Sequence, residues 1–189
     1  MTIASTYIKN AIRTESKPTP EVNERFQNAL SAIVYILDEQ KAPILILDEI
    51  KKHIFYGKKM SKDINDIIGT GNPITDPNDE TVDSQVRLVH AMLGKLTEAY
   101  EFAESVIALL KGDTSKRNVD NLVIEIGDGQ WYDAIALDEL GVPLSLCLGL
   151  NIKKLRERFP EKFDEDQAIN RDHNKEADLV RDEIKEELE

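Results

Sequence analysis

In Thr97-Glu98-Ala99-Tyr100-Glu101-Phe102-Ala103-Glu104, glutamates recur at every third position, and Glu125-Ile126-Gly127-Asp128 repeats this spacing with a second pair of acids. Residues three apart lie on one face of an α-helix, so each pair brings two like charges together. Such proximity is destabilising and needs an explanation. Two explanations stay open: the acids lie on solvated helix faces, or they hold a divalent cation between two helices.

Apolar residues surround both acidic pairs in a pattern that predicts a protein core. An acid beside an apolar stripe must be neutralised, paired or bound to a metal. Magnesium takes hard oxygen ligands, and the predicted ligands are Glu98, Glu101, Glu125 and Asp128. Glu104, one step further along, is a fifth ligand or a base, or else a surface glutamate. The predicted core residues are Leu93, Leu96, Phe102, Val106, Ile107, Leu122, Val123, Ile126, Trp131 and Ile135.

The charge of the chain argues against several classes of partner. Its 189 residues carry a net charge of −12, which disfavours binding to nucleic acids or anionic membranes. No apolar run reaches the length of a membrane span, and no signal peptide is recognised. The single cysteine, Cys147, lies in an apolar run and is expected to pack. We therefore expect a soluble cytoplasmic protein with no nucleic-acid or membrane partner.

Helical spacing of apolar residues recurs along the chain, and no segment alternates with a period of two for long. The sequence therefore predicts an all-α helical bundle. Thr19 is expected to cap a helix that starts at Pro20, Pro43 to open a new helix, and Gly57 to end it. The expected helices cover residues 4–15, 20–40, 43–57, 77–112, 118–140 and 143–159.

A faint internal repeat predicts two related helical units, although any all-α chain resembles a repeat to some degree. The expected division is an N-terminal unit 1–68, a linker 69–79, a metal-binding unit 80–172 and an acidic helix or tail 173–189. Residues 161–172 are expected to be packed but irregular.

A basic segment follows the second acidic pair. Lys154 and Arg158 stand four residues apart on one helix face, and Asn151 lies one turn before Lys154. These residues suit an anionic phosphate chain, or else form a basic outer face. Competing chemistries lack their motifs: there is no Glu-x-x-His pair, no cysteine–histidine zinc cluster and no glycine-rich nucleotide motif.

Four segments in order resemble the MazG-like, all-α nucleoside triphosphate pyrophosphohydrolases, over about residues 88–172. They are Thr97-Glu98-Ala99-Tyr100-Glu101, Asn121 to Asp128 with Trp131-Tyr132, Asn151 to Pro160, and Ala168 to Asp172. The resemblance implies hydrolysis of a nucleoside triphosphate between the α and β phosphates, with Mg²⁺ or alternatively Mn²⁺, and the same four metal ligands. Four residues depart from the family pattern. Thr97 and Ile124 stand where the family has acids, and Gly129 and Asp133 stand where it has apolar residues.

The N-terminal part is similar to the same family more weakly, in Tyr7 to Thr14 and Lys51 to Lys58. Ala42 and Leu45 stand where the two metal-binding glutamates are expected. The resemblance therefore implies a degenerate copy that packs without metal and lends Tyr56 or Lys58 to a shared pocket. The adjacent acids Asp48 and Glu49 point in different directions on a helix and are not expected to be ligands.

Together these features predict a magnesium-dependent nucleotide pyrophosphohydrolase, with a non-enzymatic nucleotide-binding or scaffold protein as the alternative. Glu101 or Glu104 would accept the proton of the attacking water. Lys154, Arg158 and Arg171 would offset phosphate charge. Trp131 and Tyr132 would pack on the base, or Trp131 would belong to the core. Single-unit relatives complete one site with helices from two chains, so the resemblance also favours a homodimer.

Overall fold

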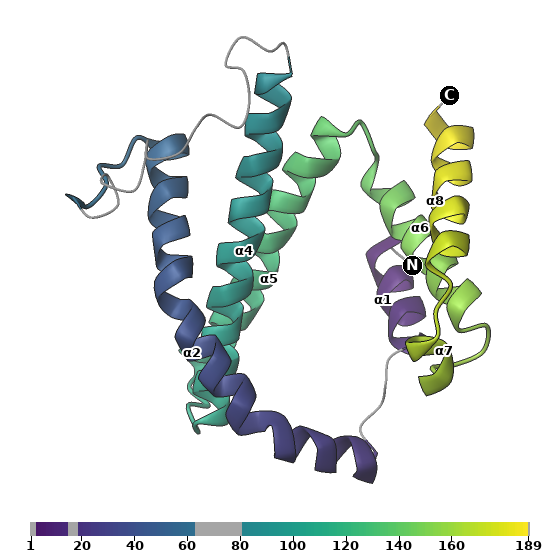
Figure 1. Cartoon of the computed structure of the whole chain (residues 1–189), viewed down its shortest axis with the longest axis horizontal. Coiled ribbons are helices and arrows are strands. Elements are labelled where there is room, and N and C mark those ends of the chain that lie inside the picture. The colour runs from purple at the N-terminus through teal and green to yellow at the C-terminus, as the bar shows by residue number, and fades with distance from the viewer. Residues whose placement is uncertain (1–2, 15–18, 63–80, 189) are drawn as a thin grey trace. The chain divides into compact units, whose positions relative to one another are not determined.

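The computed structural model describes residues 3–14, 19–62 and 81–188, and within these ranges every regular element is helical (Figure 1). This confirms the predicted all-α class. The helices are α1 (Ile3–Ala11), a 3₁₀ turn η1 (Ile12–Thr14), α2 (Pro20–Tyr56), α4 (Val82–Leu110), α5 (Lys116–Glu139), α6 (Leu144–Arg158), α7 (Glu165–Ile169) and α8 (His173–Leu188).

The helices form two compact units whose limits differ from the expected division. One unit comprises Met1–Phe26 with Gly141–Glu189, and the other comprises Gln27–Leu140. We call them the terminal unit and the central unit. The central unit therefore joins most of α2 to the two helices that carry the acidic pairs. The expected linker, 69–79, lies outside the described residues.

Helix α2 is one continuous helix, whereas the sequence predicted a break before Pro43. A proline inside a helix removes one backbone hydrogen bond, which can leave the helix bent rather than ended. Both ends follow the predicted signals. The Thr19 Oγ1 accepts a hydrogen bond from the Val22 N–H at 3.2 Å, and Gly57 follows the last turn with a φ of +66°.

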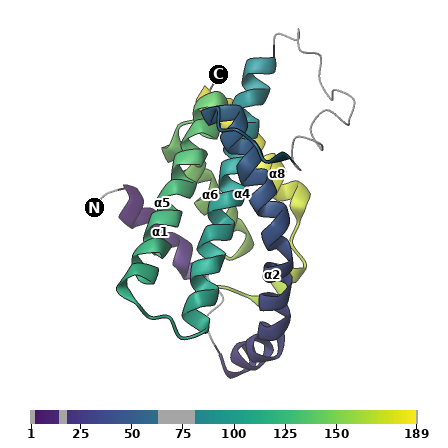
Figure 2. The same ribbon diagram turned by 90° about the vertical axis from the view of Figure 1, so that its left-hand side faces the viewer.

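Helices α4 and α5 pack against each other as an antiparallel hairpin (Figure 2). At the turn, the Asn118 side-chain amide donates to the Ser105 and Asp113 carbonyls. Further along the hairpin, the Tyr132 ring packs directly on the backbone of α4 at Gly94, where an added Cβ would lie 2.1 Å from ring carbons. Closing the hairpin brings the first acidic pair of α4 opposite the second pair on α5.

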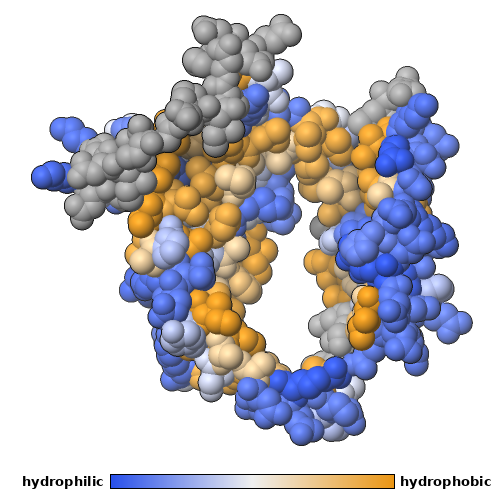
Figure 3. Space-filling view, in the orientation of Figure 1, coloured by the Kyte–Doolittle hydropathy of each residue, from blue (hydrophilic) through white to orange (hydrophobic). Residues whose placement is uncertain are grey.

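Much of the predicted core of the central unit is exposed, which corrects the expectation from the sequence. Leu93 and Ile107 are buried, but Leu96, Val123, Ile126 and Trp131 are 42–68% exposed. The space-filling view shows hydrophobic surface along α2 and α4 (Figure 3). Helical periodicity identifies an apolar face without identifying what covers it, and three helices carry more apolar faces than they bury against one another.

In the terminal unit, α1 packs against α6, and α6 packs against α8. The Arg13 guanidinium donates to the carbonyls of Pro160 and Glu161 and so ties η1 to the end of α6. The segment expected to be irregular contains α7, whose first turn is capped by the Asp164 carboxylate, and residues from 173 onward form a helix. No single described helix is long and apolar enough to cross a membrane, although α5 and α6 taken together pass by length and composition.

Candidate metal centre

Three glutamates converge between α4 and α5 in the central unit. Glu98, Glu101 and Glu125 each offer a carboxylate oxygen that lies within 4.8 Å of the other two. The helical spacing of the first two and the antiparallel hairpin together produce this arrangement. Asp128, the fourth predicted ligand, is exposed one turn further along α5 and does not belong to this cluster.

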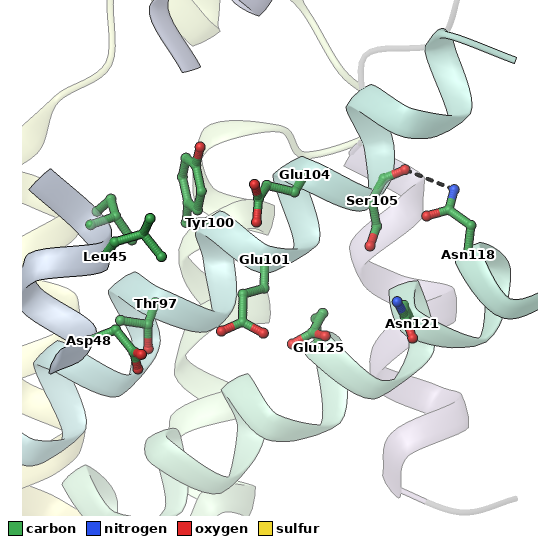
Figure 4. A pocket seen from close by; sticks show the side chains of 11 residues that line it. Leu45, Asp48, Thr97, Tyr100, Glu101, Glu104, Ser105, Asn118, Asn121 and Glu125 are labelled. Atoms are coloured by element: carbon green, nitrogen blue, oxygen red, sulfur yellow. Dashed lines mark hydrogen bonds between the residues drawn. The ribbon is translucent and has the colours of Figure 1, made fainter. Parts of the chain in front are cut away.

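A fourth carboxylate, that of Asp48, comes from α2, contrary to expectation. Asp48 lines a cavity of about 320 Å³ together with Glu101, Glu104 and Glu125 (Figure 4). Its Oδ1 atom is buried and has no hydrogen-bond partner among the described residues. Asp48 and Glu49 were not expected to be metal ligands, because adjacent acids point in different directions on a helix. One acid on the face that meets α4 is nevertheless enough to contribute a carboxylate. The i, i+4 spacing of Ile44 and Asp48 is the signal that identifies this face.

Mutual repulsion and burial perturb the acids of the cluster. Burial, followed by the charges of Glu101 and Glu98, raises the pKa of Glu125 to about 7. Burial also raises the pKa of Glu101, with smaller contributions from Glu98 and Asp48. A carboxylate with a pKa near 7 holds its proton where ordinary glutamates have lost it. The cluster therefore carries more negative charge than its surroundings compensate.

The cluster fits a hard divalent cation. Its donors are carboxylate oxygens only, and the oxygens of the three glutamates nearly converge. Magnesium–oxygen bonds of about 2.0–2.1 Å place opposite ligands about 4.2 Å apart. The observed separation of at most 4.8 Å is thus within a small adjustment of this geometry. The site would hold the ion through Glu98, Glu101 and Glu125, with Asp48 at its edge.

Two further side chains that line this cavity, those of Glu104 and Tyr100, form hydrogen bonds with α2. The Glu104 carboxylate accepts a hydrogen bond from the Lys41 Nζ at 2.6 Å. The Tyr100 hydroxyl donates to the Leu37 carbonyl at 3.3 Å. Glu104 therefore lines the cavity beside the cluster, as a base would, but an ion pair already engages one of its oxygens.

An aromatic group lies one to two helical turns from the acids. Tyr132 is buried, and Trp131, 51% exposed, packs edge-on against it with ring centroids 4.8 Å apart. His90 stacks on Phe55 at 3.8 Å, and its Nε2 atom is buried without a hydrogen-bond partner among the described residues. Burial, then the Lys51 charge, lowers the pKa of His90. Trp131 is thus a surface residue and not the core residue that was the other expectation.

The N-terminal residues expected near the pocket differ in position. The Tyr56 hydroxyl lies 3.4 Å from the Tyr132 hydroxyl, so α2 does reach the aromatic group. Lys58 is exposed, and its carbonyl accepts a hydrogen bond from the His53 ring at 2.8 Å. Neither His90 nor Phe55 was predicted as a site residue: Phe55 lies in the segment Lys51 to Lys58 without a role assigned to it, and His90 belongs to no recognised motif.

The predicted phosphate-binding residues all belong to the terminal unit, whereas the acids belong to the central unit. Lys154 and Arg171 line a cavity of about 590 Å³ on the terminal unit. The Asn151 Oδ1 accepts a hydrogen bond from the Tyr7 hydroxyl at 3.2 Å. Arg158 forms a bidentate ion pair with Glu176, both bonds at 2.6 Å, so its charge is already compensated. Sequence spacing shows that two cations share a helix face but not which anion each one meets.

Comparison with known proteins gives one informative relationship. No family model matches the chain, and no solved structure matches it. The chain is 35% identical over 79 residues to the Gene 37 protein of Mycobacterium phage L5, which covers 40% of this chain and 69% of that protein. The chain therefore belongs to the same family as the Gene 37 protein of Mycobacterium phage L5.

Proposed function

We propose that the protein is a magnesium-dependent nucleotide pyrophosphohydrolase that cleaves a nucleoside triphosphate to a monophosphate and pyrophosphate. The observation that carries the proposal is the convergence of Glu98, Glu101 and Glu125 from two antiparallel helices. The resemblance of the surrounding motifs to MazG-like enzymes supplies the reaction. Mn²⁺ is the alternative ion, because it also takes oxygen ligands.

Different residues of the chain would bind the ion and accept the proton of the attacking water. Glu98, Glu101 and Glu125 hold the ion, which when bound polarises a phosphoryl group and lowers the pKa of water. Glu101 or Glu104 accepts the proton of the attacking water, since both line the cavity. Asp128 adds negative charge near Glu125.

Each unit by itself carries some of the predicted substrate-binding residues. Trp131 offers an exposed ring for stacking on a base, supported from below by Tyr132. Lys58 is a further polar group of the central unit. On the terminal unit, Lys154 and Arg171 line one cavity and are the residues proposed to bind phosphate, with Asn151 as a further polar group. Arg158 contributes only if its ion pair with Glu176 opens.

A homodimer is part of this proposal. On α5, Val119, Val123 and Ile126 are 46–68% exposed and lie at i, i+4 and i+7, on one helix face. A second copy of the chain would cover such a face. Sedimentation over a wide concentration range tests it: we expect a dimer in the wild type and dissociation in Val123→Glu. A strictly monomeric wild type with full activity would contradict the dimer.

The alternative is a non-enzymatic nucleotide-binding or scaffold protein. Thr97 and Ile124 replace two acids of the motif that the chain resembles, which favours this alternative to the extent that those acids are needed. Binding without turnover would distinguish it.

The test is pyrophosphate release from a panel of ribo- and deoxynucleoside triphosphates, with Mg²⁺ or with chelator. We expect magnesium-dependent release by the wild type and a loss of several orders of magnitude in Glu101→Gln. Asp83→Asn is the matched control on the same helix, because its carboxylate is exposed in the first turn of α4, outside the cluster. Equal activity of Glu101→Gln and wild type would overturn the proposed site.

A further inference from the structure

Lys51 of α2 is a buried cation inside the carboxylate cluster. It is 3% exposed, and it is the only buried lysine among the described residues. Lysine is almost never buried unless it is paired, because removing its charge from water is costly. Its burial therefore indicates that the surrounding acids stabilise it.

The Lys51 ammonium meets three oxygen groups. Its Nζ lies 2.7 Å from the Thr97 Oγ1, 3.3 Å from a Glu98 oxygen and 3.3 Å from the Asp48 Oδ1. The Thr97 hydroxyl also lies 2.9 Å from the Gly94 carbonyl, to which it can donate while it accepts from Lys51. All three N–H groups of the ammonium thus face oxygen atoms, and the lysine is held from two helices.

The contacts divide the cluster into two halves. Lys51 pairs with Asp48 and Glu98, whereas neither Glu101 nor Glu125 has an ion pair with a described lysine or arginine. These two unpaired acids are the pair whose pKa values are raised. Glu98 belongs to both halves, because its Oε1 atom faces Lys51 and one of its oxygens converges with those of Glu101 and Glu125.

We propose that Lys51 is a permanent internal cation of this site, which stands in for a divalent ion between Asp48 and Glu98 and limits exchangeable metal binding to the side of Glu101 and Glu125. This inference rests on the proposed metal site and assigns a role to a residue that is not one of its ligands. Lys51 acts as a positioning residue: it holds Glu98 in place and reduces the negative charge that an incoming ion meets. Thr97, where the resembled motif has an acid, is then the neutral acceptor that this lysine requires.

The test compares Lys51→Met with wild type in metal binding, using the full chain after chelator treatment and Mn²⁺ as the probe. Free Mn²⁺ is followed by electron paramagnetic resonance. Removing one positive charge beside Glu98 strengthens attraction for the ion, so we expect Lys51→Met to bind Mn²⁺ roughly tenfold more tightly or better. Lys51→Arg, which keeps the charge, should remain close to wild type.

Lys52→Met is the matched control. It makes the same change at the next residue, whose ammonium pairs with the other Asp48 oxygen but is 37% exposed at the rim. Solvent screens that charge, so we expect a much smaller change in Mn²⁺ affinity. Unchanged or weaker Mn²⁺ binding in Lys51→Met, or an equal effect in both variants, would overturn the inference.

The melting temperatures of the variants in chelator provide a second measurement, which tests the inference even if Lys51→Met folds poorly. Replacing Lys51 by methionine removes the cation that pairs with the buried Glu98 carboxylate, so Lys51→Met should melt at a lower temperature than wild type. Adding Glu98→Gln should restore part of this loss, whereas a lysine that only fills space would give no recovery, which would also overturn the inference. If pyrophosphate release fails but Lys51→Met still tightens Mn²⁺ binding, the proposed function falls and this inference stands. If pyrophosphate release is observed but Lys51→Met does not tighten Mn²⁺ binding, the inference about Lys51 falls and the proposed function stands.

Discussion

Glu125 of α5 faces Glu101 of α4 across one cavity, and the charge of Glu101 helps burial to raise the pKa of Glu125 to about 7. The two residues are 24 positions apart in the chain and meet because the α4–α5 hairpin closes. This relationship links the stability of the protein to the function proposed for it. A cluster under like-charge repulsion is stabilised by protons or by a bound cation.

The pH dependence of stability follows from Glu125. Its folded-state pKa of about 7 lies above the ordinary value of 4.5, so the native state binds more protons than the unfolded state between these values. Stability in chelator should therefore fall as pH rises from about 4.5 to 7, by on the order of 2 kcal/mol, and stay constant for this group above 7. Urea unfolding of wild type and of Glu125→Gln at several pH values measures this dependence of the unfolding free energy on pH. A variant that keeps the full slope would show that another group is responsible.

The contact between Gly94 and Tyr132 makes position 94 intolerant of any side chain. Gly94→Ala puts a Cβ 2.1 Å from the ring, so the hairpin must open, and we expect a loss of about 3 kcal/mol. Gly127→Ala is the control: it is also inside a helix, and its added Cβ meets nothing within 4 Å. It should be neutral or stabilising by about 0.5–1 kcal/mol. Chemical unfolding of both variants checks the contrast, and equal losses would contradict the close packing.

The buried ion pair between Arg158 and Glu176 should stabilise the terminal unit. The side chains are 14% and 9% exposed, so Arg158→Met leaves the buried Glu176 carboxylate with only the distant Arg171 guanidinium at 4.0 Å and should cost about 3 kcal/mol. A double-mutant cycle with Glu176→Gln should recover much of this loss. Arg181→Met, whose pair with Asp178 is exposed, should change stability little. Additive effects in the cycle would mean that the pair is not coupled.

Local rules account for what the sequence predicted well. Thr19 and Gly57 mark the ends of α2 through cap and left-handed conformations that depend on a few neighbouring residues. The spacing of Glu98 and Glu101 follows from helix periodicity alone, and the fold class from the absence of period-two patterns.

Long-range pairing explains what the sequence did not predict. Asp48 and Lys51 belong to the site because α2 meets α4, and no local pattern specifies that encounter. Asp128 satisfies the same spacing rule as Glu101 yet is exposed and does not belong to the converging group, because spacing along one helix does not specify which residues the other helix meets. Pro43 was predicted to start a helix because a proline usually interrupts one, but the helix continues through it.

The most direct measurement of the central claim is the effect of Mg²⁺ on thermal melting of wild type and of the double variant Glu101→Gln, Glu125→Gln. In chelator, the variant should be as stable as wild type or more so, because like-charge repulsion is relieved. With Mg²⁺, the melting temperature of wild type should rise through binding to the native state, while that of the variant should not. Glu104→Gln should respond as wild type does. Equal magnesium responses in wild type and the double variant, or no response in either, would contradict a metal site at these glutamates.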